Sequence, residues 1–289
     1  MSAPRAVLIG ASGRMGRQIV RELAGSNPGI GGASDAAATQ APLRLVGAVA
    51  SAASRALGAD AGVHADTAPL GVRIAPVTQL PQLLADADVA LDFSRGASLA
   101  AHLTDCIAAR VPLLIGTTGA AAGLEAQIDA AAHGIAVLIA PNTSLAVNVL
   151  LDLVRRAAQA LPEQYDIEIV ETHHRHKLDA PSGTALALGA AAVEGRAGPP
   201  LHERAVYGRS GHDNPRVAGQ ISFASLRGGD VVGEHQVRLL GPGESLELVH
   251  RATDRAVFAR GAILAAAWLA GRSAGRYAMK DFLSDSTKA

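Results

Sequence analysis

Short apolar runs alternate with helical patterns over the first 142 residues of the chain. The apolar runs are bounded by Gly, Pro or Asp, as buried strands usually are, and they lie at residues 6–10, 43–49, 87–93, 111–117 and 135–141. The helical patterns lie at residues 15–25, 78–87, 96–110 and 121–134. Because parallel strands need crossover connections, this alternation predicts a parallel sheet with helices on both faces.

The pattern changes after residue 142. A long helical pattern at 145–160 is followed by alternating segments, typical of half-exposed strands, at 165–174, 219–227, 231–240 and 245–252. A final helical pattern at 255–270 resembles those of the first half. We therefore predict an α/β fold: a doubly wound parallel sheet of the Rossmann type from residues 1–142 and 255–289, with an α+β domain at 143–254 inserted on a mixed sheet. The aperiodic segment 25–42 is predicted to be a surface loop.

The chain of 289 residues carries 26 basic and 26 acidic side chains, so its formal net charge is zero. Bulk electrostatic binding of nucleic acid or of an anionic membrane is therefore not expected. The single cysteine, Cys106, lies in an apolar helical pattern and is predicted to be buried. One cysteine cannot form an intrachain disulfide, which fits a cytoplasmic protein. The first strand begins too early to leave room for a signal peptide, and the apolar stretch at 258–269 is too short to span a bilayer.

A glycine-rich turn joins the first predicted strand to the first helix. Glycines there let the backbone approach a pyrophosphate, and the helix N-terminus favours negative charge. A tight turn without a ligand is the alternative for the glycines, and a solvated side chain is the alternative for the arginine. The candidate cofactor residues in this turn are Gly10, Ala11, Ser12, Gly13, Arg14 and Met15.

Further loops follow predicted strands at the edge where open α/β sheets bind ligands. No carboxylate follows Val49 that would hold a ribose hydroxyl or repel a 2′-phosphate, so NADP is tolerated. Ser51 and Arg55 are candidate contacts for that phosphate, although an ordinary polar loop explains them equally well. Small residues that could line a nicotinamide pocket follow the next strands: Gly116, Thr117 and Thr118, then Ala140, Pro141, Asn142 and Thr143.

Three histidines, an arginine and a lysine occupy residues 173–177. Histidine exchanges protons near neutral pH, and a lysine beside an anion can orient it or donate a proton. If the preceding strand stays extended, His173, Arg175 and Lys177 share one side and the other two histidines the opposite side. This density of proton donors indicates an enzyme that binds an anion and protonates it.

A zinc site is the minor alternative for this run. His174, His176 and Asp179 have ligand chemistry and suitable spacing, but the neighbouring Arg175 and Lys177 disfavour a divalent cation. No metal is therefore expected.

A Pro-Ser-Gly-Thr turn follows the basic run and begins a helical pattern. Ser182 is the predicted N-cap, and the first-turn N–H groups of Gly183 and Thr184, with the two hydroxyls, can bind a carboxylate or a phosphate. The ligand predicted for the basic run and this turn together is small and anionic, and it accepts a proton during the reaction.

These motifs together resemble 4-hydroxy-tetrahydrodipicolinate reductases. The resemblance rests on GASGRMG, GTTG, HHRHKLDAPSGTA, VVGEH (231–235) and FARGAILAAAWLAG (258–271), and it covers nearly the whole chain in order. It implies NADPH or NADH as cofactor and a small cyclic dicarboxylate as substrate. The implied reaction is reduction of 4-hydroxy-tetrahydrodipicolinate to tetrahydrodipicolinate, with loss of water, in diaminopimelate and lysine biosynthesis. It also implies a homotetramer assembled through the sheet of the inserted domain.

The resemblance assigns roles by motif. His173 is the implied general acid/base and Lys177 a proton donor, while His174, Gly183 and Thr184 hold the substrate carboxylates. The cofactor would contact residues 10–15, 116–118 and 140–143. Three features depart from the family pattern. Ser51 replaces an acidic residue, which leaves the cofactor preference open, and Thr143 replaces an aromatic one. The loop at 25–42 is longer than is usual in the family.

Two other functions are compatible with the same fold. One is a non-catalytic dinucleotide-sensing regulator, which would not need the proton donors His173 and Lys177. The other is a different two-domain NAD(P)-dependent dehydrogenase. An aldehyde dehydrogenase would need a nucleophilic cysteine, whereas Cys106 lies in a helical pattern away from the substrate motifs.

Overall fold

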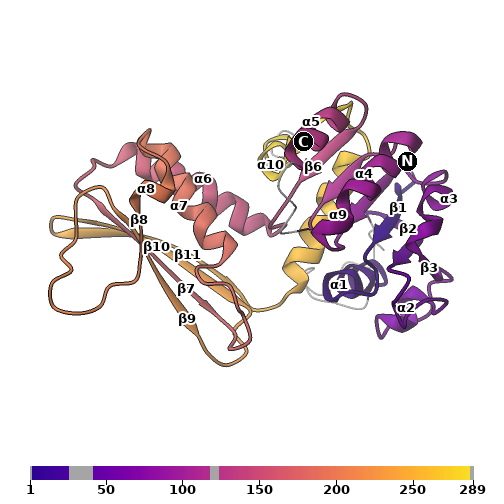
Figure 1. The fold of residues 1–289 in the computed structure, drawn as a ribbon, viewed down its shortest axis with the longest axis horizontal. Helices are drawn as coiled ribbons and strands as arrows, with labels where there is room; N and C mark the ends of the chain where they lie inside the picture. The colour runs from indigo at the N-terminus through magenta and orange to yellow at the C-terminus, as the bar shows by residue number, and fades with distance from the viewer. Residues whose placement is uncertain (1, 26–41, 118–123, 287–289) are drawn as a thin grey trace, which may run out of the picture. The chain divides into compact units, whose positions relative to one another are not determined.

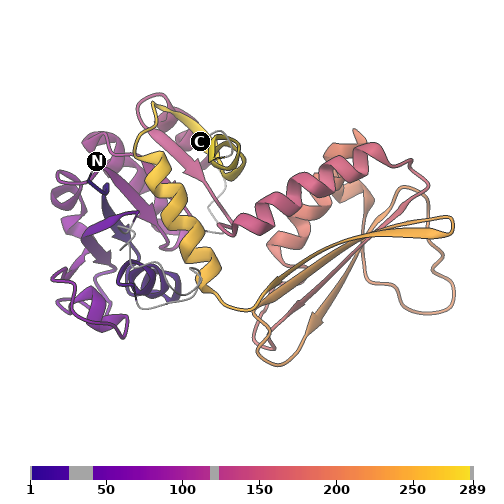
Figure 2. The same cartoon turned by 180° about the vertical axis from the view of Figure 1, so that it is seen from behind.

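The computed structural model describes residues 2–25, 42–117 and 124–286 (Figures 1 and 2). Most of the predicted loop at 25–42 lies outside these residues. Contacts between Cα atoms divide the chain into two compact units, Met1–Leu145 with Ala256–Ala289 and Ala146–Arg255. The boundaries predicted from sequence fall at 142/143 and 254/255.

The first unit is built on a parallel sheet of seven strands in the order β12-β6-β5-β4-β1-β2-β3. This arrangement confirms the predicted Rossmann-like sheet, with the order reversing between β1 and β4. The sequence pattern missed β3 and β12, which are too short to show a period. The strands are β1 (Arg5–Ile9), β2 (Arg44–Ala50), β3 (Ile74–Pro76), β4 (Val89–Asp92), β5 (Leu113–Ile115), β6 (Ala136–Ile139) and β12 (Gly275–Ala278).

Helices cover both faces of this sheet (Figure 1). Successive side chains of β1 point to opposite faces, so that Leu8 packs in one core with α1 and α9, whereas Val7 and Ile9 pack in the other with α3, α4 and α5. The helices of this unit are α1 (Arg14–Leu23), α2 (Ala61–His64), α3 (Leu80–Leu84), α4 (Leu99–Ala109), α5 (Leu124–Ala132), α9 (Ala256–Leu269) and α10 (Met279–Ser286), with 3-10 turns η1 (Val77–Gln79) and η2 (Gly96–Ser98).

Two residues illustrate this packing. Cys106 is fully buried in α4, as predicted, and burial raises the pKa of its thiol. Arg260 of α9 donates from Nε to Glu22 of α1 at 2.8 Å. The helix α9, which follows the second unit in the chain, therefore packs in the first unit.

The second unit contains a five-stranded sheet in the order β11-β10-β7-β9-β8. β10 is antiparallel to β7 and β11, while β9 is parallel to β7 and β8, so the sheet is mixed, as predicted. Figure 2 shows the long helix α6 beside this sheet. The elements are α6 (Leu145–Ala160), β7 (Asp166–His173), α7 (Gly183–Arg196), α8 (Leu201–Arg204), β8 (Ala205–Tyr207), β9 (Ile221–Arg227), β10 (Gly233–Gly241) and β11 (Glu244–Ala252).

One face of the mixed sheet packs against the helices. Ile167 and Ile169 of β7 share a core with Val154 of α6 and with Leu188 and Ala192 of α7. The burial of alternate β7 residues continues through residues 171 and 173, so the same face carries polar side chains at the end of the strand. No helix among the described residues is long and apolar enough to cross a membrane.

Candidate active site

The end of β7 brings a carboxylate and an imidazole together. Glu171 and His173 continue the inward face of the strand and are 1% and 8% exposed. His173 Nδ1 lies 2.5 Å from Oε2 of Glu171. The strand period therefore pairs an acidic side chain with a predicted catalytic residue two positions later.

Glu171 accepts hydrogen bonds from further elements. Arg227, the last residue of β9, donates from both terminal nitrogens to the two carboxylate oxygens, each at 2.8 Å. The backbone N–H of Ser182 donates to Oε1 at 3.1 Å. Burial alone would raise the pKa of Glu171, but hydrogen bonds from Arg227, Ser225 and His173 outweigh it and hold the pKa at about 2. Glu171 is therefore ionised at neutral pH.

A second buried histidine, His235 of β10, completes this cluster. Its ring lies edge-on to that of His173, with the centroids 5.1 Å apart, and its Nε2 lies 3.0 Å from Oγ of Ser182. Burial first, and then the nearby His173, lower the pKa of His235 to about 4. Because the Ser182 hydroxyl also accepts from Ala185 N–H at 3.1 Å, it can donate its own hydrogen to neutral His235.

The chain turns immediately after His173, so the extended conformation does not persist beyond the end of β7. The N–H of Lys177 donates to the carbonyl of His174, which closes a turn. The N–H of Arg175 donates to the carbonyl of Gly229 in the β9–β10 connection. These bonds end the alternation, and residues 173, 175 and 177 do not share a strand face. Lys177 Nζ pairs instead with Asp179 at 2.8 Å.

The start of α7 matches its prediction. Ser182 is the N-cap and accepts from the N–H of Ala185. A Cβ at Gly183 would have no heavy atom within 4 Å, so space is open in front of the first turn. An open helix N-terminus beside a proton-exchanging histidine can bind an anionic group. The structure thus brings Ser182 and Gly183 close to the Glu171–His173 pair.

The basic run shows no metal site. His174 and His176 have ring centroids 6.3 Å apart, and the Asp179 carboxylate is paired with Lys177. Within residues 2–25, 42–117 and 124–286, no group of three or more His, Cys, Asp or Glu side chains could hold a metal ion.

The glycine turn of the first unit lies where the sheet order reverses, after β1 and beside the end of β4. Gly10 has a φ of +87°, and a Cβ there would lie 2.7 Å from the carbonyl oxygen of Phe93. A Cβ at Gly16 would lie 2.3 Å from the carbonyl oxygen of Gly10. The N-cap of α1 is Gly13, which has no side chain to cover the first N–H groups. This close, uncapped turn fits a pyrophosphate.

A buried acid–base pair, missed in the sequence, supports the neighbouring loop. Asp92, at the end of β4, is fully buried, and its carboxylate lies 2.8 Å from Nδ1 of His102 in α4. The hydroxyl of Thr117 donates to Asp92, and so does the N–H of Ser94. Burial would raise the pKa of Asp92, but hydrogen bonds from His102 and Ser94 outweigh it and keep the pKa low. The pair fixes Thr117 after β5, and only the period of α4 hinted that His102 points inward.

The remaining predicted cofactor residues are spread over three places. Ser51 and Arg55 are exposed after β2, where they could meet a phosphate. Ala140 is buried after β6, and Asn142 accepts from Ser144 N–H. The Thr143 hydroxyl donates to the carbonyl of Phe258 in α9, so this side chain is engaged within its own unit. Thr118 lies outside the described residues.

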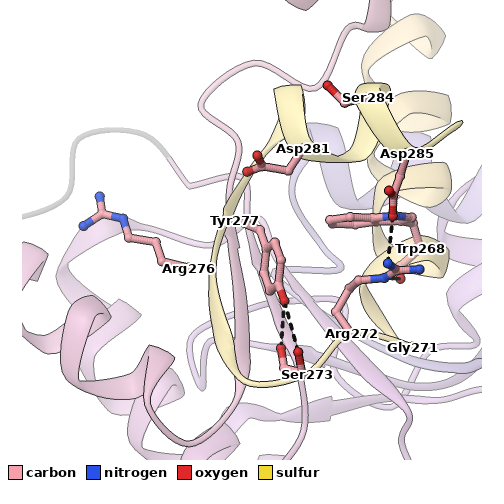
Figure 3. A pocket seen from close by; sticks show the side chains of 9 residues that line it. All are labelled: Trp268, Gly271, Arg272, Ser273, Arg276, Tyr277, Asp281, Ser284 and Asp285. Carbon is pink, nitrogen blue, oxygen red and sulfur yellow. Dashed lines mark hydrogen bonds and ion pairs between the residues drawn. The ribbon is translucent and has the colours of Figure 1, made fainter. Parts of the chain in front are cut away.

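A pocket of about 660 Å³ lies in the C-terminal segment of the first unit, and none of the predicted site residues lines it (Figure 3). Its wall contains the Trp268 ring, which donates from Nε1 to Asp285 and lies under the Arg272 guanidinium at 4.8 Å. The lining residues are Trp268, Gly271, Arg272, Ser273, Arg276, Tyr277, Asp281, Ser284 and Asp285.

Both halves of the chain match sequence models of one family. The model described as "Dihydrodipicolinate reductase, N-terminus" matches residues 4–143, and "Dihydrodipicolinate reductase, C-terminus" matches residues 146–283. The 4-hydroxy-tetrahydrodipicolinate reductase of Acinetobacter baumannii (strain AYE) is 44% identical over 98% of this chain and 97% of its own length. That of Anaeromyxobacter dehalogenans (strain 2CP-1 / ATCC BAA-258) is 47% identical over 96% and 97%.

Solved structures agree on the fold. The dipicolinate-bound dihydrodipicolinate reductase from Paenisporosarcina sp. TG-14 has a TM-score of 0.71 and 22% identity, and the match covers 96% of this chain and 97% of that chain. The amine dehydrogenase from Mycobacterium smegmatis has a TM-score of 0.57 and 12% identity, over 95% and 94%. The structural likeness shows the fold, while the sequence matches over nearly the full length show that the chain belongs to the dihydrodipicolinate reductase family.

Proposed function

We propose that this protein is an NAD(P)H-dependent oxidoreductase that reduces 4-hydroxy-tetrahydrodipicolinate to tetrahydrodipicolinate, with loss of water, in diaminopimelate and lysine biosynthesis. One observation carries the proposal: the proton-exchanging His173 and the start of α7 are both held by the buried carboxylate of Glu171. The names of relatives 44% and 47% identical to the chain support the same substrate. The proposed compartment is the cytoplasm.

The second unit supplies the proposed substrate site. The N–H groups at the start of α7 and the hydroxyl of Thr184 bind one carboxylate, and His174 contacts the dicarboxylate as well. The Ser182 hydroxyl, bonded to Ala185 N–H and His235, positions this turn for the substrate. His173 and Lys177 exchange protons with the substrate as electron density builds up on its ring. Cationic side chains beside that ring stabilise the developing charge.

The first unit supplies the proposed cofactor site. Bound NADH or NADPH supplies the hydride. The turn at 10–15 holds its pyrophosphate, and residues 116–118 and 140–143 surround its nicotinamide end. Ser51 and Arg55 are the proposed contacts of the 2′-phosphate of NADPH. No acidic side chain directly follows β2 that would repel this phosphate.

The proposed assembly is a homotetramer formed through the face of the mixed sheet that is turned away from α6 and α7. Registers place Leu226 of β9 beside Thr172, and Ala224 beside Val170, on that face. Val249 of β11 pairs with Gln236 in the same row. Leu226 and Val249 are 52% and 41% exposed in a single chain, so this face offers apolar area to a second copy.

A coupled assay tests the reaction. The purified protein is mixed with aspartate semialdehyde, pyruvate and the preceding synthase, and oxidation of NADH and NADPH is followed in parallel. We expect oxidation of at least NADPH, and the ratio of the two rates gives the preference. Oxidation of neither cofactor would refute the proposal.

The two alternatives are not favoured. Relatives that match over nearly the full length carry the reductase name, rather than that of a regulator or of another dehydrogenase. A dinucleotide-sensing regulator would bind NADPH without oxidising it in the coupled assay.

A further inference from the structure

Arg227 binds the carboxylate that also holds His173. Its two terminal nitrogens donate to the two oxygens of Glu171, each at 2.8 Å, and one of them also donates to the carbonyl of Asp179 at 2.5 Å. His173 Nδ1 lies 2.5 Å from the Glu171 oxygen Oε2. The imidazole and the guanidinium therefore share one buried carboxylate.

We propose that Arg227 is a charge-balancing and positioning residue for proton transfer by His173: its two hydrogen bonds to Glu171 let the carboxylate orient the imidazole while its negative charge is offset. This inference rests on the proposed function, in which His173 exchanges a proton with the substrate. An unbalanced buried carboxylate beside a histidine holds the imidazolium form. A bidentate guanidinium is the side chain best shaped to neutralise that carboxylate without displacing the histidine.

The geometry also selects the ring atom that exchanges the proton. Ionised Glu171 is an acceptor only, so Nδ1 of His173 carries the hydrogen that faces it and Nε2 is the exchanging atom. Gly233 of β10 lies against this atom, because a Cβ at Gly233 would be 3.0 Å from Nε2. A glycine at this position leaves the ring room to keep its bond to Glu171.

The charged and titratable groups facing His173 come from every element around it. They are Glu171 on β7, Arg227 on β9, Lys177 on the following turn, and His235 on β10, behind which lies His250 of β11. Burial lowers the pKa of His173, Glu171 opposes this in part, and Lys177 and Arg227 lower it further.

The ligand-free histidine is therefore neutral at pH 7. A dianionic ligand reverses this balance, because negative charge beside the ring favours the imidazolium. Binding of such a ligand then draws a proton onto Nε2 of His173.

An NMR titration of the histidine ring signals in the full-length protein tests the charge balance, with His173→Gln used to assign the signal. The His173 pKa is expected below 6.5. Arg227→Gln leaves Glu171 unbalanced and should raise that pKa by about 1 or more. Arg227→Lys keeps the positive charge and should stay within about 0.5 of the parent value. The matched control Arg156→Gln removes an exposed arginine paired with Asp152, and should change nothing.

The double variant Glu171→Gln/Arg227→Gln answers the question even where Arg227→Gln alone does not fold, because it leaves no buried charge without a partner. Because the carboxylate that Arg227 offsets is gone, its His173 pKa should not rise above the parent value. A rise like that expected for Arg227→Gln would show that Arg227 acts on His173 other than through Glu171, and would overturn the proposal. An unchanged pKa in folded Arg227→Gln would overturn it as well.

Calorimetry with dipicolinate gives a second readout. Titrations at pH 7 in two buffers of different ionisation enthalpy should show proton uptake on binding, and less uptake in Arg227→Gln. Binding without proton uptake by the parent protein would contradict the proposal. Neither measurement needs turnover, so a failed coupled assay would refute the proposed reaction without deciding the role of Arg227.

Discussion

At the scale of single residues, Lys177 and His173 differ in how firmly they are held. Lys177 has one ion pair, with Asp179, whereas His173 is bonded within the buried cluster. Lys177→Ala removes a proton donor without disturbing a core, so the turnover number should fall by about 10²-fold to 10⁴-fold. Binding of NADPH, followed by its fluorescence, should not change. Normal turnover would remove Lys177 from the proposed mechanism.

The variant His173→Gln tests whether His173 exchanges a proton with the substrate. The amide can still bond to Glu171 but cannot donate a proton near neutral pH, so the loss should again appear in the turnover number rather than in NADPH affinity. A loss of NADPH affinity alone would mean that the histidine belongs to another site.

At the scale of elements, one serine ties the start of α7 to the sheet. Ser182→Ala removes the cap bond to Ala185 N–H and leaves His235 Nε2 without its partner, so the free energy of unfolding should fall by about 1–3 kcal/mol. Dipicolinate should also bind more weakly. Urea unfolding and calorimetry measure the two effects. The matched variant Ser182→Thr keeps a hydroxyl, so it should lose less stability and less dipicolinate affinity than Ser182→Ala. Equal losses in the two variants would contradict the assigned bonds.

The same cluster makes the fold sensitive to acid. The pKa of His235 falls from an ordinary 6.5 to about 4 in the folded chain, mainly through burial. Below pH 6.5 the unfolded chain takes up this proton before the folded chain does. The free energy of unfolding should therefore decrease by at most about 3 kcal/mol as the pH falls from 6.5 towards 4. Urea unfolding from pH 7.5 to 4 measures this loss.

The variant His235→Asn should flatten that pH dependence. Its matched control is His202→Asn, because the His202 side chain is 79% exposed. An equal pH slope in His235→Asn and in the parent protein would contradict the assignment.

At the scale of the whole molecule, the sequence pattern predicts regular elements well and side-chain clusters poorly. The bounds of α6 agree with the prediction at both ends, because its apolar period is long. Whether the strand stays extended past His173 is left open by the pattern, because its end depends on hydrogen bonds to the β9–β10 connection. Arg227 and His235 join the site from strands more than fifty residues away in sequence. His235 closes the VVGEH motif, but no local pattern pairs either residue with His173. The strand period places Glu171 on the same face as Ile167 and Ile169, but its partners come only from the folded sheet.

The oligomeric state is a property of the assembly rather than of a single chain. Light scattering after size exclusion should give a mass close to four times 29.3 kDa. Val249→Glu introduces a charge into the open face of the sheet and should produce smaller species, because burying an unpaired carboxylate between copies is costly. Val149→Glu is the matched control: this valine of α6 is 46% exposed, against 41% for Val249, and lies outside the sheet. If both variants keep the parent mass, the open face is not the interface; if the control also dissociates, added charge alone explains the effect.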